Sequence, residues 1–259
     1  MKNLGEVINA VYRSVNAQRT RRWDIVDDII PELNSAIREY VKAYYDDIKK
    51  THTGVYFEAA QIVKAKLRKL VVRKYLLPVN DGIATLPADY WYDVGLEVFL
   101  SGMKGQYSSS LSFNEEKPAL LNSFYRPSTD NIQHMEYDRV LEIKYGGGES
   151  SIEKALLDYI KEPIAMYAIP FTSGTVVPGK LYWAEEGTID DGSYSVTDGV
   201  YAATSAIPVT VTGNAYEISD LQLGSDSWDE IVAITARKLM GISSDIERKQ
   251  NSDFESSKS

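Results

Sequence analysis

The sequence contains no cysteine and only two histidines, His52 and His134. The absence of cysteine excludes disulfide bonds, thiolate zinc sites, iron–sulfur clusters and cysteine nucleophiles. Because the two histidines lie far apart along the chain, a metal centre rich in histidine is excluded as well. A single Ser-His pair brought together by folding is not excluded. We interpret His52 as a polar residue at a helix end rather than a catalytic group.

Long apolar runs are also missing. No segment approaches the roughly 18 uninterrupted apolar residues that a membrane-spanning helix requires. The stretch from Met1 to Arg22 has no apolar core of the kind found in signal peptides. We therefore expect a protein with no membrane partner that is made in a cytoplasm.

The composition is otherwise that of a globular protein, with 44% apolar and 25% charged residues among 259. A chain of this length buries enough surface to fold without a metal or a disulfide. Tyrosine is unusually frequent, with 18 residues against 6 phenylalanines. Because tyrosine combines a large ring with a polar tip, this excess suits partly hydrated interfaces.

The charge is unevenly distributed. Residues 1–75 contain 15 Lys/Arg and 9 Asp/Glu, a net +6, whereas residues 76–259 contain 13 and 28, a net −15. An acidic body does not bind nucleic acid through its overall charge. Opposite charges on two parts of one chain suit head-to-tail contacts between identical subunits. The alternative is a solvated helical face.

Apolar spacings of three and four predict three helices in a helical region over residues 1–75. The first two carry the stripes Leu4, Val7, Ile8, Val11 and Val15, and then Val26, Ile30, Leu33, Ile37, Tyr40, Tyr44 and Ile48. Pro31 fits the first turn of the second helix, capped by Asp27 or Asp28, or else marks a kink. The third stripe is Tyr56, Ala60, Val63, Leu67, Leu70 and Val71.

The other face of this third helix is basic, and it is the candidate for proximity to DNA. Its cations are Lys64, Lys66, Arg68, Lys69, Arg73 and Lys74. A solvated face, or one paired with acidic neighbours, is the more common use of such a run.

Residues 76–165 predict a β-rich domain. Tyr90–Leu100 reads as a strand, and Lys117–Phe124 as one short helix. Arg139–Tyr145 and Ile152–Lys161 read as the two strands of a β-hairpin, joined by the glycine-rich loop Gly146–Ser151. Pro163 closes the second strand.

Residues 166–220 predict a small all-β insertion. Its short strands alternate with turns and cover Lys180–Ala184, Tyr194–Val196, Gly199–Ala202, Val209–Thr212 and Tyr216–Ile218. Residues 221–247 predict a C-terminal helix that packs on the helical region, with Ser227 as N-cap and Glu230 completing a capping box. Its expected buried stripe is Trp228, Ile231, Val232, Thr235, Leu239, Ile242 and Ile246. We expect residues 248–259 to form a flexible tail.

No pattern predicts a catalytic, cofactor-binding or metal-binding residue. The Gly146–Ser151 loop lacks the Gly-Lys-Ser/Thr ending of a phosphate-binding loop. Asp190–Ser193 with Asp198 lacks the alternating ligands of a calcium loop, so we interpret it as a surface turn. Glu185-Glu186 supplies adjacent carboxylates of the kind that arise by chance in an acidic chain. We therefore expect no cofactor and no enzymatic activity.

Six rings of the insertion allow two interpretations, a sugar-binding surface or the core of a small β-domain. They are Phe171, Tyr182, Trp183, Tyr194, Tyr201 and Tyr216.

Several segments, in order, resemble a family of virion proteins from podovirus-like phages, especially crAss-like phages. They are Lys69-Leu70-Val71-Val72, Leu86-Pro87-Ala88-Asp89-Tyr90-Trp91, Asn122-Ser123-Phe124-Tyr125-Arg126-Pro127, Leu157-Asp158-Tyr159-Ile160-Lys161-Glu162-Pro163 and Asp229-Glu230-Ile231-Val232. The resemblance covers residues 1–165 and 218–247. Residues 166–217 depart from it, because such relatives pass quickly from the Tyr-Ile-Lys-Glu-Pro strand to the last helix.

The resemblance implies a structural subunit of an oligomeric ring in the head–tail connector or upper tail. Such an adaptor joins the portal to tail components and helps retain packaged DNA. The expected partners are further copies of the chain, the portal and neighbouring ring or tail proteins. The expected location is the virion. The alternative function is a tail-associated carbohydrate-binding module that uses the 166–220 section. The expected fold is α+β, with an N-terminal helical bundle completed by the C-terminal helix, a β-domain with a hairpin and the β insertion.

Overall fold

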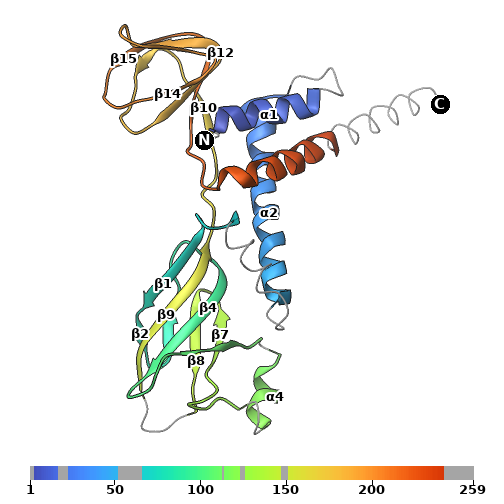
Figure 1. The fold of residues 1–259 in the computed structure, drawn as a ribbon, viewed down its shortest axis with the longest axis vertical. Helices are drawn as coiled ribbons and strands as arrows, with labels where there is room; N and C mark the ends of the chain where they lie inside the picture. Colours follow the sequence, from blue (N-terminus) through green and yellow to red (C-terminus); the bar gives the residue numbers. More distant parts are fainter. Residues whose placement is uncertain are drawn as a thin grey trace, which may run out of the picture. The chain divides into compact units, whose positions relative to one another are not determined.

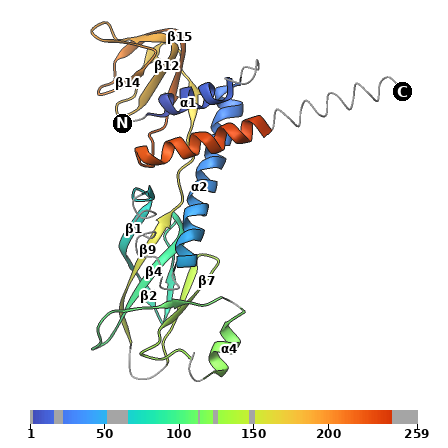
Figure 2. The same cartoon turned by 45° about the vertical axis from the view of Figure 1, so that its right-hand side comes forward.

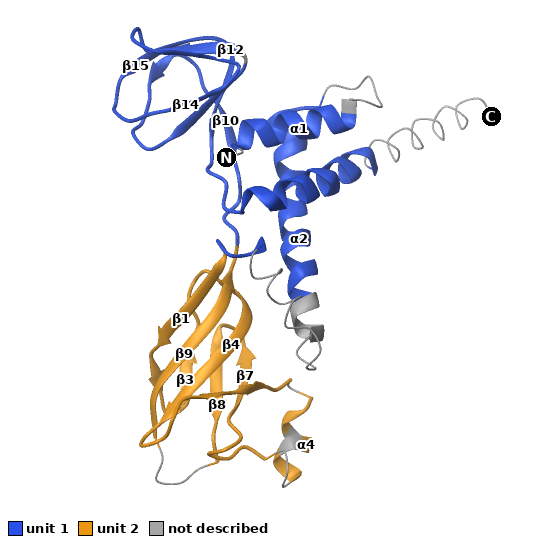
Figure 3. Cartoon of the chain, in the orientation of Figure 1, with its two compact units in different colours: residues 1–69, 163–259 blue, residues 70–162 orange. Residues whose placement is uncertain are grey.

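A computed structural model describes residues 3–16, 23–51, 66–112, 114–122, 126–146 and 151–241. The chain divides into two compact units (Figure 3). Unit 1 combines residues 1–69 with residues 163–259, and unit 2 is residues 70–162. Two N-terminal helices, a C-terminal helix and several sheets make the protein α+β, as the sequence predicts. No helix in the described part of the chain is long and apolar enough to cross a membrane.

The N-terminal helices of unit 1 are α1 (Leu4–Asn16) and α2 (Ile30–Thr51), the latter preceded by a π turn, η1 (Ile25–Ile29). The predicted α1 stripe is confirmed, since all five of its side chains are at most 1% exposed. In the second stripe Ile30, Leu33, Ile37 and Tyr40 are buried, Tyr44 is half-buried and Val26 is 36% exposed, while the side chain of Ile48 lies outside the described part.

The predicted cap of the second helix, Asp27 or Asp28, is wrong. The Asp24 carboxylate accepts hydrogen bonds from the Val26 and Asp27 N–H groups and caps η1 instead. The wide π turn then leads into α2 just before Pro31. We attribute this turn to Pro31, which has no N–H to donate to a preceding carbonyl.

The C-terminal helix covers described residues 228–241 and lies across α2 (Figures 1 and 2). Lys238 joins the two helices by donating to the Ser35 hydroxyl at 2.8 Å and pairing with Glu39 at 2.9 Å. The predicted capping box is wrong. Ser227 ends a short 3₁₀ turn, η2 (Ser225–Ser227), is fully buried, and donates its hydroxyl to the Lys66 carbonyl. Residues 242–259, with Ile242, Ile246 and the predicted tail, lie outside the described part.

The insertion in unit 1 is a curled six-stranded sheet (Figure 1). Its strands are β10 (Ala168–Pro170), β11 (Gly174–Thr175), β12 (Leu181–Asp190), β13 (Ser195–Thr197), β14 (Val200–Ala202) and β15 (Pro208–Ile218). The two short strands expected at 209–212 and 216–218 are one long strand, β15, because it pairs with β12 along almost its whole length. Gly5 of α1 lies directly against the Trp183 indole of β12.

Unit 2 is a β-sandwich (Figure 2). One sheet has the order β1-β9-β4-β5 and the other β2-β3-β8-β7-β6. The strands are β1 (Val71–Leu77), β2 (Val79–Asn80), β3 (Ile83–Thr85), β4 (Tyr90–Leu100), β5 (Gln106–Tyr107), β6 (Ser109–Ser110), β7 (Gln133–Tyr137), β8 (Val140–Lys144) and β9 (Ile152–Lys161). Buried side chains of both sheets, such as Leu96, Leu141 and Leu157, form one core cluster.

The predicted hairpin of Arg139–Tyr145 with Ile152–Lys161 is wrong. Both segments are strands, but β8 pairs with β3 and β7, whereas β9 pairs with β1 and β4 in the other sheet. β8 instead forms a hairpin with β7 through Asp138-Arg139, where both residues have positive φ. A two-residue turn of this handedness matches the twist of the strands that it joins.

The predicted helical region extends too far. Lys66 is helical, residues 67–70 form turns, and the chain is already in β1 from Val71. The β-branched pair Val71-Val72 and the following Pro78 favour a strand that ends before the proline. The short helix α4 covers Glu116–Leu121, within one residue of the predicted start. Residues 52–65, with His52, Tyr56, Ala60, Val63 and Lys64, lie outside the described part.

Candidate functional site

The β1 strand forms an open edge of its sheet. Among the described strands it pairs only with β9, so its other side presents backbone N–H and C=O groups outward. A bulge interrupts the pairing, because Arg73 and Lys74 together oppose Asp158. Lys74 has a φ of 53°, and its N–H donates to the Asp158 carboxylate at 2.6 Å. This hydrogen bond offsets the strain of a left-handed lysine.

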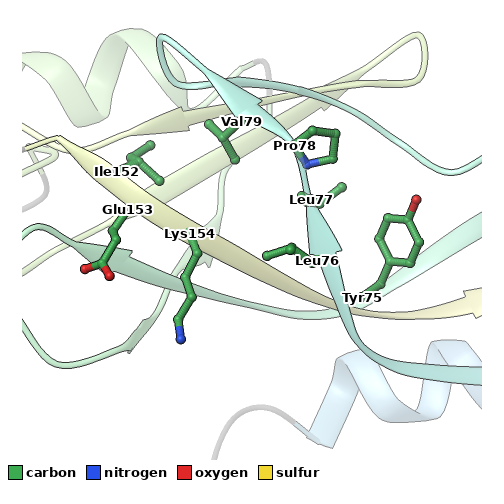
Figure 4. Close-up of a pocket in the computed structure, with 8 residues that line it drawn as sticks. All are labelled: Tyr75, Leu76, Leu77, Pro78, Val79, Ile152, Glu153 and Lys154. Atoms are coloured by element: carbon green, nitrogen blue, oxygen red, sulfur yellow. The ribbon is translucent and has the colours of Figure 1, made fainter.

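Beside this edge lies an open pocket of about 550 Å³, which we call the β1 groove (Figure 4). It is lined by Tyr75, Leu76, Leu77, Pro78, Val79, Ile152, Glu153 and Lys154. Leu76 is 61% exposed and Tyr75 40% exposed. The Lys154 ammonium lies 4.2 Å from the centre of the Phe99 ring, a cation–π contact that holds its stem at the groove.

The chemistry of the β1 groove suits a macromolecular contact. Its floor is apolar, and its two charged side chains, Glu153 and Lys154, are exposed rather than buried. A small-ligand site usually adds a few buried polar groups that fix orientation. An open strand edge beside exposed leucine and tyrosine is instead the arrangement into which another polypeptide packs.

A second cluster joins the two sheets of unit 2. The His134 ring of β7 contacts the Ser108 hydroxyl through Nδ1 at 2.7 Å and the Asp93 carboxylate of β4 through Nε2 at 3.2 Å. The Ser108 hydroxyl is also 3.2 Å from the Leu96 carbonyl oxygen. The Ser-His pair that the sequence left open therefore forms, and Asp93 is a third member that the sequence analysis missed.

The geometry of this cluster differs from that of a catalytic triad. In a serine hydrolase the serine faces Nε2 and the aspartate faces Nδ1, whereas here the two nitrogens are exchanged. The His134 side chain is 3% exposed, and none of the three residues lines the β1 groove. Because an ionised carboxylate only accepts, Nε2–H donates to Asp93. We interpret the cluster as a polar latch between the sheets.

The predicted basic helical face is wrong for residues 67–74, which form turns and the first part of β1, and Lys64 lies outside the described part. Lys66 pairs with Glu230 of the C-terminal helix and donates to the Tyr44 hydroxyl at 2.6 Å. Arg68 and Lys69 are exposed in the turns before β1, and Arg73 and Lys74 are exposed on β1 itself. The helical spacing fails because the chain becomes a strand at Val71.

The Lys66–Glu230–Tyr44 cluster makes unit 1 sensitive to acid. The hydrogen bond from Lys66 is the main cause that lowers the pKa of Glu230, and the bond from the Tyr44 hydroxyl lowers it further. A carboxylate whose pKa is lower in the folded state stabilises the fold at neutral pH. That stabilisation is lost as the pH falls through the folded-state pKa.

We therefore expect Glu230→Gln to flatten the loss of stability on acidification. Urea denaturation between about pH 7 and pH 3 measures it. Tyr44→Phe, which keeps the Lys66–Glu230 pair, is the matched variant and should retain most of the acid sensitivity. An equally steep decline in wild type and Glu230→Gln would contradict the assignment.

The six rings of the insertion form mostly its core and not a binding platform. Tyr182, Trp183 and Tyr201 are at most 5% exposed. Phe171 lies 4.6 Å from Tyr182 and Tyr216 5.9 Å from Trp183, measured between ring centres. Tyr194 alone of the six is exposed, at 63%.

The aspartates singled out in the insertion accept hydrogen bonds from nearby backbone N–H groups. Asp190 accepts from the Gly192 N–H, Asp191 from the N–H groups of Ser193 and Tyr194, and Asp198 from the Gly187 N–H. The surface turn predicted there is present. Glu185 lies on β12 beside Glu186, whose side chain is outside the described part. Within the described residues no three acidic or histidine side chains gather as a metal site would need.

The glycine-rich loop also follows a strand that does not lead into a helix. It joins β8 to β9, and its residues 147–150 lie outside the described part.

No protein-family model matches the chain, and no curated protein matches it in sequence.

Proposed function

We propose that the chain is a structural subunit of an oligomeric ring in the head–tail connector or upper tail of a tailed phage. It joins portal and tail components, helps retain packaged DNA and performs no catalysis. It is made in the host cytoplasm and resides in the virion. This proposal is motivated by the segments that resemble, in the same order along the chain, ring proteins of podovirus-like phages.

The observation that carries the proposal is the β1 groove with its open strand edge. Soluble proteins commonly protect such edges with a bulge or a proline, because a free edge pairs with another chain. Here the bulge at Arg73-Lys74 and Pro78 flank a remaining stretch, Tyr75–Leu77, of which Tyr75 and Leu76 are exposed. A subunit that repeats one contact around a ring uses surfaces of this kind.

Further exposed apolar side chains support the proposal that the protein contacts several partners. Leu121 of α4 is 88% exposed and Tyr107 of β5 is 74% exposed. Tyr107 belongs to the Gly102–Ser112 segment, which we propose, with the N-terminal helices and the C-terminal tail, for contacts between subunits or between rings.

The proposed contact with DNA now rests on fewer residues. Lys66 is engaged by Glu230, so the exposed cations Arg68, Lys69, Arg73 and Lys74 are the described candidates. The carbohydrate-binding alternative receives no support from a platform of rings, because five of the six aromatic residues pack within the insertion or against it.

The test is the oligomeric state of the purified protein, measured by mass photometry alone and with the portal of the same phage. We expect rings of about a dozen copies, or binding that requires the portal. A stable monomer that ignores the portal would overturn the proposal.

A further inference from the structure

The lining of the β1 groove holds one cation, Lys154, and one acid, Glu153, and two further cations, Arg73 and Lys74, directly precede its lining residue Tyr75 along β1. Arg73 and Lys74 are exposed on β1, and Lys154 lines the groove from β9. Glu153 is the acidic residue of the lining, and Asp158 accepts the Lys74 N–H beside it. An occupant that matches this site therefore brings an apolar or aromatic group with a carboxylate next to it.

The insertion presents such a group at the turn between β12 and β13. Tyr194 is 63% exposed there, and the exposed Asp190 lies next to it, because Asp190 pairs with Ser195 in the β12–β13 ladder. Residues 166–220 contain seven Asp/Glu and a single cation, Lys180. Because Lys180 already pairs with Glu217 at 2.7 Å, no cation within the insertion neutralises the turn.

The turn holds Tyr194 in a defined position. One oxygen of Asp191 accepts from the N–H groups of Ser193 and Tyr194, and the other accepts from the Tyr201 hydroxyl at 2.8 Å. Tyr201 is 5% exposed and belongs to the core of the insertion. A side chain presented on a fixed turn loses little conformational entropy when it binds.

We propose that the β1 groove of one copy receives the Tyr194 turn of a second copy. The Tyr194 ring lies against Leu76, Pro78 and Ile152, and the Asp190 carboxylate next to it faces Arg73 and Lys74. This inference rests on the ring subunit proposed above and names its repeated contact. The two surfaces differ, so the contact is head-to-tail, which is the type that closes into rings.

Cysteine cross-linking tests this contact directly, because the natural chain contains no cysteine. One variant carries Leu76→Cys and a second, of different mass through a tag, carries Tyr194→Cys. The two are mixed under the conditions in which the protein assembles, with the portal where it is required. Any disulfide between the two masses joins different copies by construction.

We expect the Leu76→Cys and Tyr194→Cys chains to form mixed disulfides at least about fivefold faster than a matched pair. That pair replaces Leu76→Cys by Ile83→Cys, at an exposed isoleucine of the same unit that is 48% exposed. Adding Arg73→Glu to the Leu76→Cys chain should remove most of this advantage. Equal rates for the two pairs would overturn the contact.

Mass photometry of the same samples distinguishes failure of the proposed contact from failure of the proposed ring. Rings that form without the preferred disulfide would reject the contact and leave the ring subunit in place. An absence of rings and of mixed disulfides, with and without the portal, would reject both. The last outcome concerns protection of Leu76→Cys from a thiol reagent. Stronger protection by duplex DNA than by the cysteine-free wild-type chain would show that nucleic acid, and not a second copy, occupies the groove.

Discussion

Replacing His134 by alanine should lower the free energy of unfolding by about 2–4 kcal/mol. The substitution removes two hydrogen bonds across the sandwich and leaves the Asp93 carboxylate without its donor. The Oδ1 atom of Asp93 is already buried without a hydrogen-bond partner among the described residues. The carboxylate therefore relies on His134 for compensation of its burial, and the loss exceeds that of a surface hydrogen bond.

Urea denaturation measures this effect, and two further variants define its origin. Ser108→Ala should cost about 1 kcal/mol, since the imidazole keeps its bond to Asp93. Asp93→Asn keeps the shape and removes the charge, so it should cost less than His134→Ala. Losses of equal size for Ser108→Ala and His134→Ala would contradict a latch centred on the imidazole–carboxylate bond.

Replacing Gly5 by alanine should destabilise unit 1 by about 1–3 kcal/mol. In a helix this substitution ordinarily stabilises, because glycine is a poor helix former. Here a Cβ at position 5 would lie 2.6 Å from the Trp183 indole. Trp183 is 2% exposed and stacks on Tyr216, so the indole has no room to move aside.

The matched control is Gly241→Ala in the C-terminal helix, where an added Cβ meets nothing within 4 Å. It should be neutral or stabilise by up to about 1 kcal/mol. Thermal unfolding of both variants provides the comparison. Similar shifts in melting temperature for the two would show that α1 does not need the close approach to β12.

The apolar period predicted the helices well where a single face is buried. The α1 stripe and the first half of the C-terminal stripe are buried as expected, because a period of 3.6 allows only one such face. The same period failed at Leu67–Val71. Leu67 and Leu70 are buried, but the helix ends at Lys66 and the chain reaches β1 at Val71 through turns. Their spacing does not distinguish a helix from a turn that enters a strand.

Strand positions were easier to predict than strand partners. β8 and β9 lie where alternation places them, but the sequence does not state which strands pair. The assumption that neighbours along the chain form a hairpin placed them in one sheet. Asp81-Gly82, a strong hairpin signal that joins β2 to β3, was available in the sequence and was overlooked.

Most of the candidate sites could not be predicted from the sequence, because they depend on contacts between residues far apart along the chain. Ser108 and Asp93 lie 26 and 41 residues from His134, and only the stacking of the two sheets brings them together. The β1 groove likewise depends on the pairing of β1 with β9, which begin 81 positions apart. The excess of tyrosine indicated interfaces in general, without showing that Tyr75 and Tyr194 are exposed while Tyr182 is not.

The route of the chain through its two units also sets an order of folding during synthesis. Unit 2 is continuous in sequence, and its first and last strands pair with each other, from Val71 with Ile160 to Leu77 with Ala155. It can complete its core as soon as Glu162 leaves the ribosome. The packing of unit 1 cannot be completed at that stage. Tyr44 of α2 and Lys66 both bind Glu230, which is made more than 160 positions later. In the interval the buried stripes of the N-terminal helices lack their final cover, so chaperones have a defined target on the nascent chain.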